Sequence, residues 1–140
     1  MLVNQNKVSM KNKLILVGLA VLSMTFLSCE DDFNDHIIEV LGVYDANVVG
    51  LTPIFDMSVS SIQGDDIAIE ALFDGEVWSV VEADIDGVEN FVKDIDIRRQ
   101  VLGPGVEIWG NGFYSDRTIQ LNYTMKFGSE LFDFVIIGSK

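Results

Sequence analysis

The sequence has few of the residues on which many functional sites depend. Its 140 residues include one cysteine and one histidine, and nine lysines and arginines stand against 22 aspartates and glutamates. One cysteine excludes an intramolecular disulfide framework, and one histidine excludes a multi-histidine metal centre within the chain. The formal charge of −13 argues against nucleic acid as a partner, because phosphate binding needs clustered lysine and arginine.

Signals for catalysis are equally scarce. A nucleophilic triad needs a histidine close to a cleft, and the only histidine, His36, lies near the N-terminal segment. Neither a GxGxxG motif nor a P-loop is present, so nucleotide cofactors have no recognisable site. We therefore predict no enzymatic activity and no cofactor. A carboxylate-based hydrolase stays open as an alternative, because any two of the 22 acids could face each other.

The N-terminal segment has the pattern of a secretory signal peptide. Lys11 and Lys13 precede an uninterrupted run without charge over residues 14–27, which is too short for a comfortable membrane crossing. A small residue, Ser28, follows this run directly. We predict a signal peptide over residues 1–28, with Met10 as an alternative start of the chain.

The end of this segment, Phe26-Leu27-Ser28-Cys29, resembles a bacterial lipobox, with Phe26 in the place of the usual leucine. The resemblance implies that Cys29 is lipidated and becomes the first residue of the mature chain. Three acyl chains on one cysteine would make attachment effectively permanent. Two alternatives are a cytosolic protein with a buried N-terminal helix and a secreted form without lipid.

An acidic run, Glu-Asp-Asp-Phe-Asn-Asp over residues 30–35, follows the cysteine. Its position resembles the surface-export signal of lipoproteins in Bacteroidetes-type bacteria, which implies an outer-membrane and cell-surface location. The alternative is a solvated tether that only keeps the domain off the bilayer. All 22 acids but only six of the nine bases follow residue 28, so the mature chain has a charge of −16. We therefore expect the lipid, and no basic patch, to hold the protein to the membrane. We divide the mature chain into a lipidated acidic tether over 29–36 and one domain over 37–140.

Alternation of apolar and polar residues marks β-strands through this domain. It is strictest over residues 119–127, where Ile119, Leu121, Tyr123, Met125 and Phe127 share one face. Turn residues such as Asp-Gly and Gly-Pro-Gly interrupt the runs at fairly regular spacing, which favours hairpins. The expected strands cover residues 43–49, 54–60, 67–73, 77–85, 91–97, 106–113, 119–127 and 131–137.

These features predict an all-β fold, an antiparallel up-and-down meander of about eight strands in a closed or nearly closed small barrel. A two-sheet sandwich is the alternative. Gly42-Val43-Tyr44 at the first strand and Gly110-Asn111-Gly112 near the sixth or seventh strand, with the lipobox, resemble the small lipocalin-like (calycin-like) lipoproteins of Bacteroidetes-type bacteria. That resemblance implies a fold and a location more than an activity.

Aromatic and acidic residues supply the candidate sites. Trp78, Trp109 and Tyr114 are candidates to line an apolar ligand pocket, against the alternative of ordinary core filling. Asp84, Asp86 and Glu89 are weak candidates for calcium, and Asp94 and Asp96 are expected on the adjoining strand. Their spacing fails the EF-hand pattern, so we favour a solvated acidic turn and predict no metal.

The combined expectation is a lipid-anchored outer-membrane lipoprotein without catalysis. Its barrel would bind a small apolar or amphipathic ligand or a surface partner. The alternative is a structural envelope protein with a filled barrel and no ligand. The bulky positions of residues 119–127 and 132–136 favour a filled interior, whereas Ala71, Ser79 and Ala83 favour a hollow one.

Overall fold

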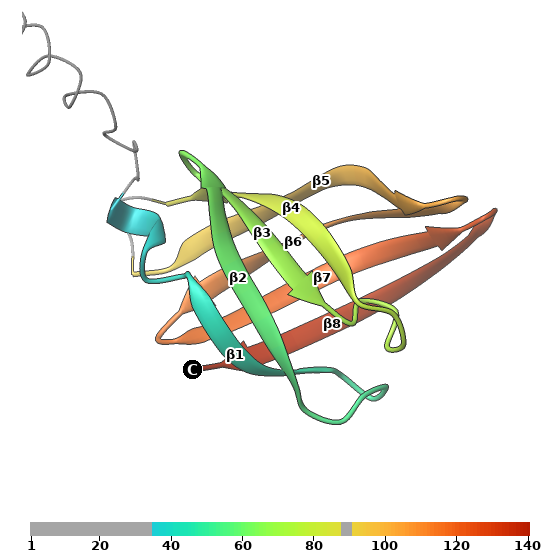
Figure 1. Ribbon diagram of the computed structural model, residues 1–140, viewed down its shortest axis with the longest axis horizontal. Coiled ribbons are helices and arrows are strands. Elements are labelled where there is room, and N and C mark those ends of the chain that lie inside the picture. Colours follow the sequence, from blue (N-terminus) through green and yellow to red (C-terminus); the bar gives the residue numbers. More distant parts are fainter. Residues whose placement is uncertain (1–34, 88–90) are drawn as a thin grey trace, which may run out of the picture. The chain divides into compact units, whose positions relative to one another are not determined.

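The computed structural model describes residues 35–87 and 91–140. The predicted signal peptide, Cys29, most of the predicted tether and Glu89 lie outside these residues. The described elements are a short 3₁₀ helix, η1 (Asp35–Ile37), and eight strands (Figure 1). The strands are β1 (Gly42–Val48), β2 (Phe55–Gln63), β3 (Asp66–Ala71), β4 (Ser79–Asp86), β5 (Lys93–Gly103), β6 (Val106–Ser115), β7 (Thr118–Phe127) and β8 (Glu130–Ser139).

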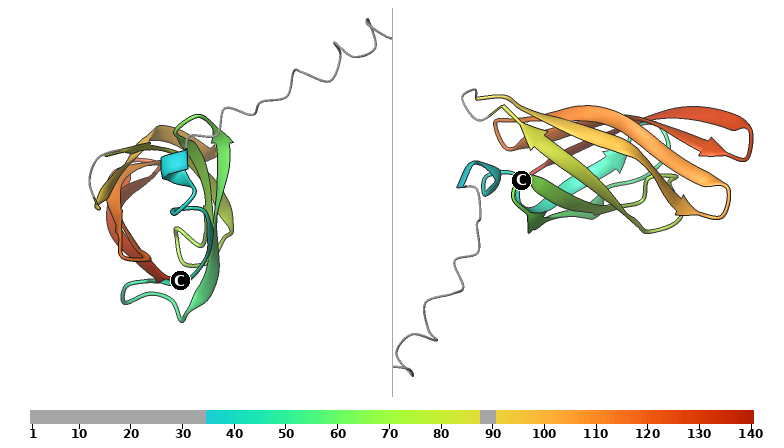
Figure 2. Two further views of the ribbon diagram at one scale, coloured as in Figure 1. Left: turned by 90° about the vertical axis from the view of Figure 1, so that its left-hand side faces the viewer. Right: turned by 90° about the horizontal axis from the view of Figure 1, so that it is seen from above.

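The eight strands form one closed antiparallel barrel in sequence order, with β8 paired back to β1. Figure 2 shows this ring in its left view, with η1 at the near end. The predicted eight-stranded meander is therefore confirmed, and the sandwich alternative is wrong. Closure joins the first and last strands, and over their paired length this removes the edges that an open sheet would expose. None of the helices within residues 35–87 and 91–140 is long and apolar enough to cross a membrane.

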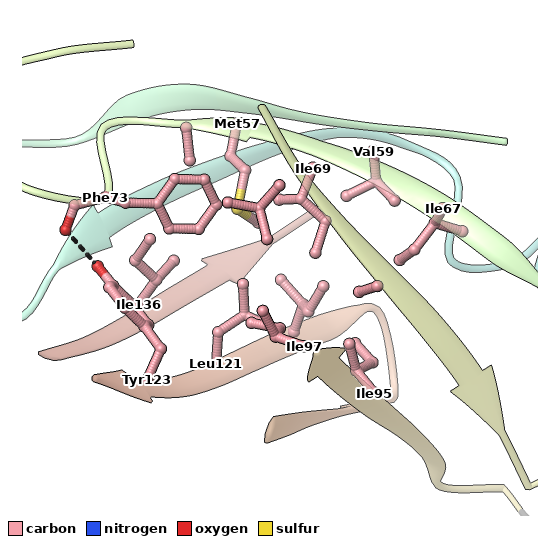
Figure 3. Close-up of a cluster of buried hydrophobic side chains, with 14 of the residues drawn as sticks. Met57, Val59, Ile67, Ile69, Phe73, Ile95, Ile97, Leu121, Tyr123 and Ile136 are labelled. Atoms are coloured by element: carbon pink, nitrogen blue, oxygen red, sulfur yellow. Dashed lines mark hydrogen bonds between the residues drawn. The ribbon is translucent and has the colours of Figure 1, made fainter. Parts of the chain in front are cut away.

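The interior of the barrel is filled by the chain's own side chains (Figure 3). In β7 the predicted alternation is confirmed, because Ile119, Leu121, Tyr123 and Met125 are all buried. Each of the remaining strands also places alternate side chains in the barrel interior, since successive side chains of a strand point to opposite faces. The largest fully buried members include Tyr44, Met57, Ile67, Ile69, Phe73, Ile85, Ile95, Ile97 and Ile108.

Two glycines of β6 let the neighbouring strand approach closely. A Cβ at Gly110 would lie 2.2 Å from the carbonyl oxygen of Asn122, and one at Gly112 would lie 2.2 Å from that of Gln120. Real Cβ atoms are not found so close to backbone atoms, so only glycine fits at these positions. The Gly110-Asn111-Gly112 motif therefore has a packing role within the barrel wall.

The strands differ in length, and this makes the two ends of the barrel unlike. β5 to β8 have 10 or 11 residues, whereas β1 to β4 have six to nine. β4 pairs with β5 only from Asp84↔Asp96 to Asp86↔Asp94, and β1 pairs with β8 only as far as Val48↔Ile136. Beyond these pairs β5 to β8 continue as a sheet, which we call the flared end (residues 98–109 and 123–135; Figure 1). The opposite end, with η1 and the β2–β3 and β6–β7 turns, is the closed end.

Candidate functional site

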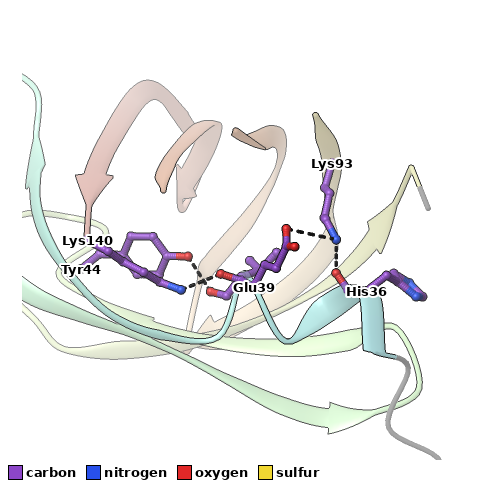
Figure 4. A network of polar contacts seen from close by, with 6 residues as sticks. His36, Glu39, Tyr44, Lys93 and Lys140 are labelled. Carbon is purple, nitrogen blue, oxygen red and sulfur yellow. Dashed lines mark hydrogen bonds and ion pairs between the residues drawn. The ribbon is translucent and has the colours of Figure 1, made fainter. Parts of the chain in front are cut away.

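Polar contacts tie η1 and the residues after it to the closed end (Figure 4). The Lys93 ammonium, on a side chain only 8% exposed, donates to the carbonyl oxygen of His36 and lies 3.8 Å from the Glu39 carboxylate. The Lys140 ammonium donates to the carbonyl oxygens of Glu39 and Leu41, both at 2.6 Å. These cations satisfy carbonyl groups of a segment that makes no strand, so they hold the segment over the barrel.

Tyr44 completes this closure from inside the barrel. Its hydroxyl donates to the carbonyl oxygen of Val40 at 2.5 Å, and the Lys140 ammonium lies 4.9 Å from its ring centroid. Burial, followed by the nearby Tyr114, raises the pKa of Tyr44 well above its usual range. Burial and the charge of Arg117 lower the pKa of Lys140, and Glu39 opposes this shift. The described contacts of the closed end are thus those of a structural cap.

The predicted tether residue His36 lies within η1. Its imidazole Nε2 lies 2.9 Å from the Asp65 carboxylate in the β2–β3 turn. The only histidine of the chain therefore contacts the barrel rather than a nucleophile, and it adds to the cap at the closed end.

Aspartates face one another across β3, β4 and β5 on the outside of the barrel. The register places Asp66 opposite Asp84, Asp84 opposite Asp96, and Asp86 opposite Asp94, as expected from the sequence for Asp94 and Asp96. A hydrogen bond with Asp84, followed by slight burial, raises the pKa of Asp66. Like charges directly opposite each other in a sheet are destabilising, and a shared proton relieves part of that repulsion.

This arrangement bears on the calcium candidates. Asp84 forms an ion pair with Arg98 and hydrogen-bonds Asp66, so its oxygens already have partners. Asp86 is exposed beside Asp94, and Glu89 lies outside the described residues. No group of three or more His, Cys, Asp or Glu residues in the described parts of the chain is arranged to hold a metal ion.

The Asp66–Asp84 pair can be compared with the two catalytic carboxyl groups of a hydrolase. A hollow of about 200 Å³ lies beside them, lined by Asp66, Glu82, Asp84, Arg98 and Gln100 among others. Asp66 and Asp84 are in direct hydrogen-bond contact. The two carboxyl groups of a retaining glycosidase stand about 5 Å apart, with the reacting carbon between them. The Asp66–Asp84 pair leaves no such space.

The three aromatic candidates lie in three separate places. Trp78 lies in the loop between β3 and β4, half exposed, with its ring edge-on to Phe55 at 5.7 Å between centroids. Trp109 lies on the outer face of β6 with the Arg99 guanidinium 4.1 Å above its ring. Tyr114 is buried inside the closed end, 5.7 Å from the Lys140 ammonium. The structure does not bring them together, and a ligand-binding role for each stays a prediction.

The flared end carries apolar side chains that the sequence had suggested for the interior. Phe132 continues the inward period of β8 but is 45% exposed, because β1 and β2 no longer lie opposite it. Its neighbour Leu131 is 60% exposed, and Val101 across the sheet is 71% exposed. Phe132 contacts Phe127 edge-on at 5.9 Å. The strand lengths expected from the sequence do not reveal this difference, because they run from seven to nine residues in both halves of the barrel.

A buried aromatic group marks the boundary between barrel and flare. The Tyr123 hydroxyl donates to the carbonyl oxygen of Phe73 at 2.6 Å (Figure 3). The Tyr123 ring packs edge-on against Phe73 and stacks on Phe134. Burial, followed by the charge of Asp74, raises the pKa of Tyr123 well above its usual range. Phe73 thus plugs the barrel where the flare begins.

The fold and these contacts define a class, a closed eight-stranded antiparallel barrel with a filled interior, which is compatible with a lipocalin-like fold. Comparison with known proteins adds no name to this class. No family model, no curated protein and no solved structure matches the chain.

Proposed function

We propose that this chain is a lipid-anchored envelope protein whose barrel is a non-catalytic interaction module. One contrast carries the proposal: the interior is filled by the chain's own side chains, whereas apolar side chains are exposed at the flared end. Interior ligands need unoccupied space, and a filled eight-stranded barrel has little of it. Exposed apolar groups grouped on one part of a surface are typical of contacts with partners.

The location rests on the N-terminal segment. The signal-like run, the lipobox-like Phe26-Leu27-Ser28-Cys29 and the acidic residues after it support lipidation at Cys29 and export to the outer membrane and cell surface. A closed barrel of eight strands is also compatible with the small lipocalin-like lipoproteins that the sequence resembles.

A structural envelope protein without any ligand is the second candidate. The filled interior supports it as well, and the exposed apolar groups of the flared end are what favour an interaction role over it. The contact between Asp66 and Asp84 does not have the carboxyl separation of a retaining glycosidase, so it lends no support to a hydrolase of that kind.

Fractionation of cells that produce Cys29→Ala tests the anchor. We expect the wild-type chain in the outer membrane and Cys29→Ala in the soluble or inner-membrane fraction, because the charge of −16 gives no other hold on a bilayer. Ser28→Ala is the matched control, since it keeps a small residue before the cysteine and should behave as wild type. Outer-membrane attachment of Cys29→Ala would overturn the proposal.

A further inference from the structure

The flared end leaves two sheet edges beyond the closed barrel, and the β5 edge is protected. Register shifts between Ile97 and Gln100 and between Val101 and Gly103 interrupt its regular ladder. The Gln100 side chain also bonds the backbone of Glu82 twice, accepting from its N–H at 2.9 Å and donating to its carbonyl oxygen at 2.8 Å. Bulges and covered backbone groups are devices by which proteins block pairing at an edge.

The β8 edge has neither device. Its ladder with β7 runs without a shift from Thr118↔Ser139 to Phe127↔Glu130. On its other side, the last contact with β1 is the bond from the Val49 N–H to the Val135 carbonyl oxygen, at 2.9 Å. No strand of the described residues pairs with residues 130–134 on that side (Figure 1).

The geometry identifies the backbone groups that this edge offers. In an antiparallel strand, a residue's N–H and C=O point to one side, and the side alternates along the chain. Val135 points toward β1, so Asp133 and Leu131 point the same way, into the unpaired side. The side chains around them include Leu131, 60% exposed, and Phe132, 45% exposed. A regular edge with unpaired backbone groups is a template for another strand.

We propose that residues 130–134 of β8 accept an extended segment of a partner protein as a ninth strand, and that this segment alternates apolar residues with lysine or arginine. Backbone hydrogen bonds would supply affinity, and contacts with Leu131 and Phe132 would supply specificity. This inference rests on the interaction role proposed above but not on lipidation.

Charge selects the partner. Glu130 and Asp133 lie on the strand itself, and the whole chain carries −13. A basic segment complements these charges, whereas a second copy of this chain would bring its own Glu130 and Asp133 to the same edge. The edge is therefore matched to a foreign basic strand rather than to self-association.

The test uses the full chain in detergent micelles and a short peptide that alternates valine and lysine, followed by titration calorimetry. Asp133→Pro removes the outward N–H and leaves the ladder with β7 intact, because Asp133 does not point toward β7. Asp133→Ala is its matched control, since it loses the same carboxylate and the same 2.6 Å bond from Thr124 but keeps the N–H. We expect Asp133→Pro to bind roughly tenfold more weakly than Asp133→Ala.

Peptide variants separate the outcomes. The proposal expects much weaker binding when the lysines are replaced by glutamates, and when the peptide amides on one edge are N-methylated. The proposal would be overturned if the methylated peptide bound as tightly as the unmethylated one. It would also be overturned if Asp133→Pro and Asp133→Ala bound the peptide equally well while both variants kept the circular dichroism spectrum of the wild type. A dimer of this chain in sedimentation that is lost in Asp133→Pro would overturn it as well, because the strand bound at the β8 edge would then belong to a second copy of the chain. Loss of peptide binding leaves the Cys29→Ala result untouched, so the two proposals fail separately.

Discussion

The two ends of the barrel use similar residues to opposite effect. At the closed end Ile37 and Val40 are fully buried, and Lys93 and Lys140 hold the backbone above them. At the flared end Leu131 and Phe132 remain exposed, and the strands that carry them have outrun their neighbours. Apolar side chains of the inward period, such as Ile119 and Leu121, are therefore buried where the sheet closes, whereas Phe132 of the same period is exposed where it stays open. Strand length, rather than composition, decides at which end the inward period becomes exposed.

Substitution of the glycines tests this difference most severely. Gly110→Ala should prevent folding or cost more than about 3 kcal/mol of stability, because its Cβ would lie 2.2 Å from the Asn122 carbonyl oxygen. Gly103→Ala, at the tip of the flare, is the control, since its Cβ would meet no atom within 4 Å. Denaturant unfolding measures both. Similar stabilities for the two variants would contradict the close packing of β6 on β7.

Truncation of apolar side chains compares the two ends directly. Ile119→Ala, at a fully buried position of the closed half, should lose about 3 kcal/mol in the free energy of unfolding. Phe132→Ala should lose about 1 kcal/mol or less, because its side chain is 45% exposed in the folded chain. Urea titration followed by tryptophan fluorescence gives both values. A larger loss for Phe132→Ala would show that the flared end is part of the core.

The two buried tyrosines test the contacts that cap the barrel and plug it. Tyr44→Phe and Tyr123→Phe each leave a carbonyl oxygen, of Val40 or Phe73, without its donor. We expect each to cost about 1 to 2 kcal/mol at neutral pH. Thermal unfolding measures the loss, and Tyr114→Phe is the comparison variant because no described hydrogen bond involves its hydroxyl.

The same tyrosines give a pH dependence. Their pKa values are raised in the folded chain, so above the unfolded pKa of about 10 the unfolded chain binds fewer protons. Their contribution to stability is complete below that pH and is lost as the pH rises toward the folded pKa. The wild type should lose more stability between pH 9 and 11 than the Tyr44→Phe, Tyr123→Phe double variant. Parallel pH profiles for the two proteins would contradict this explanation.

The smallest effect is expected at the outer aspartates. The pKa of Asp66 is raised in the folded chain, so the stability that its proton contributes is present below the unfolded pKa and lost as the pH rises through the folded pKa. Asp66→Asn should therefore raise the melting temperature slightly at pH 7 and leave it unchanged at pH 3. Calorimetry at both values checks this, and a lower melting temperature at pH 7 would show that the carboxylate is stabilising.

The barrel itself could be predicted from the sequence, and the flare could not. Strict alternation over residues 119–127 and the Asp-Gly and Gly-Pro-Gly turns follow from local rules, and these rules led to eight strands in meander order. The exposure of Phe132 depends on where β1 stops pairing with β8, which is a relation between distant segments. The strand expected over residues 77–85 begins only at Ser79, and Val77, which lies before it, is 59% exposed.

The candidate site was predictable in part for the same reason. Asp94 and Asp96 were expected beside Asp84 and Asp86, and the β4–β5 register confirms this. The separation of Trp78, Trp109 and Tyr114 depends on which face and end of the barrel each occupies. The spacing of residues within one strand does not show at which end of the barrel a side chain will lie.

Native mass spectrometry of the full chain, extracted mildly from its own envelope, tests the central claim most directly. The account predicts no small-molecule adduct on the lipidated chain, because the interior is filled by residues such as Leu121, Ile97 and Met57. An additional mass of small-molecule size, too small for a partner protein, that is present in the native spectrum and disappears on denaturation would show a bound small molecule. That result would contradict a filled barrel that acts only through its surface.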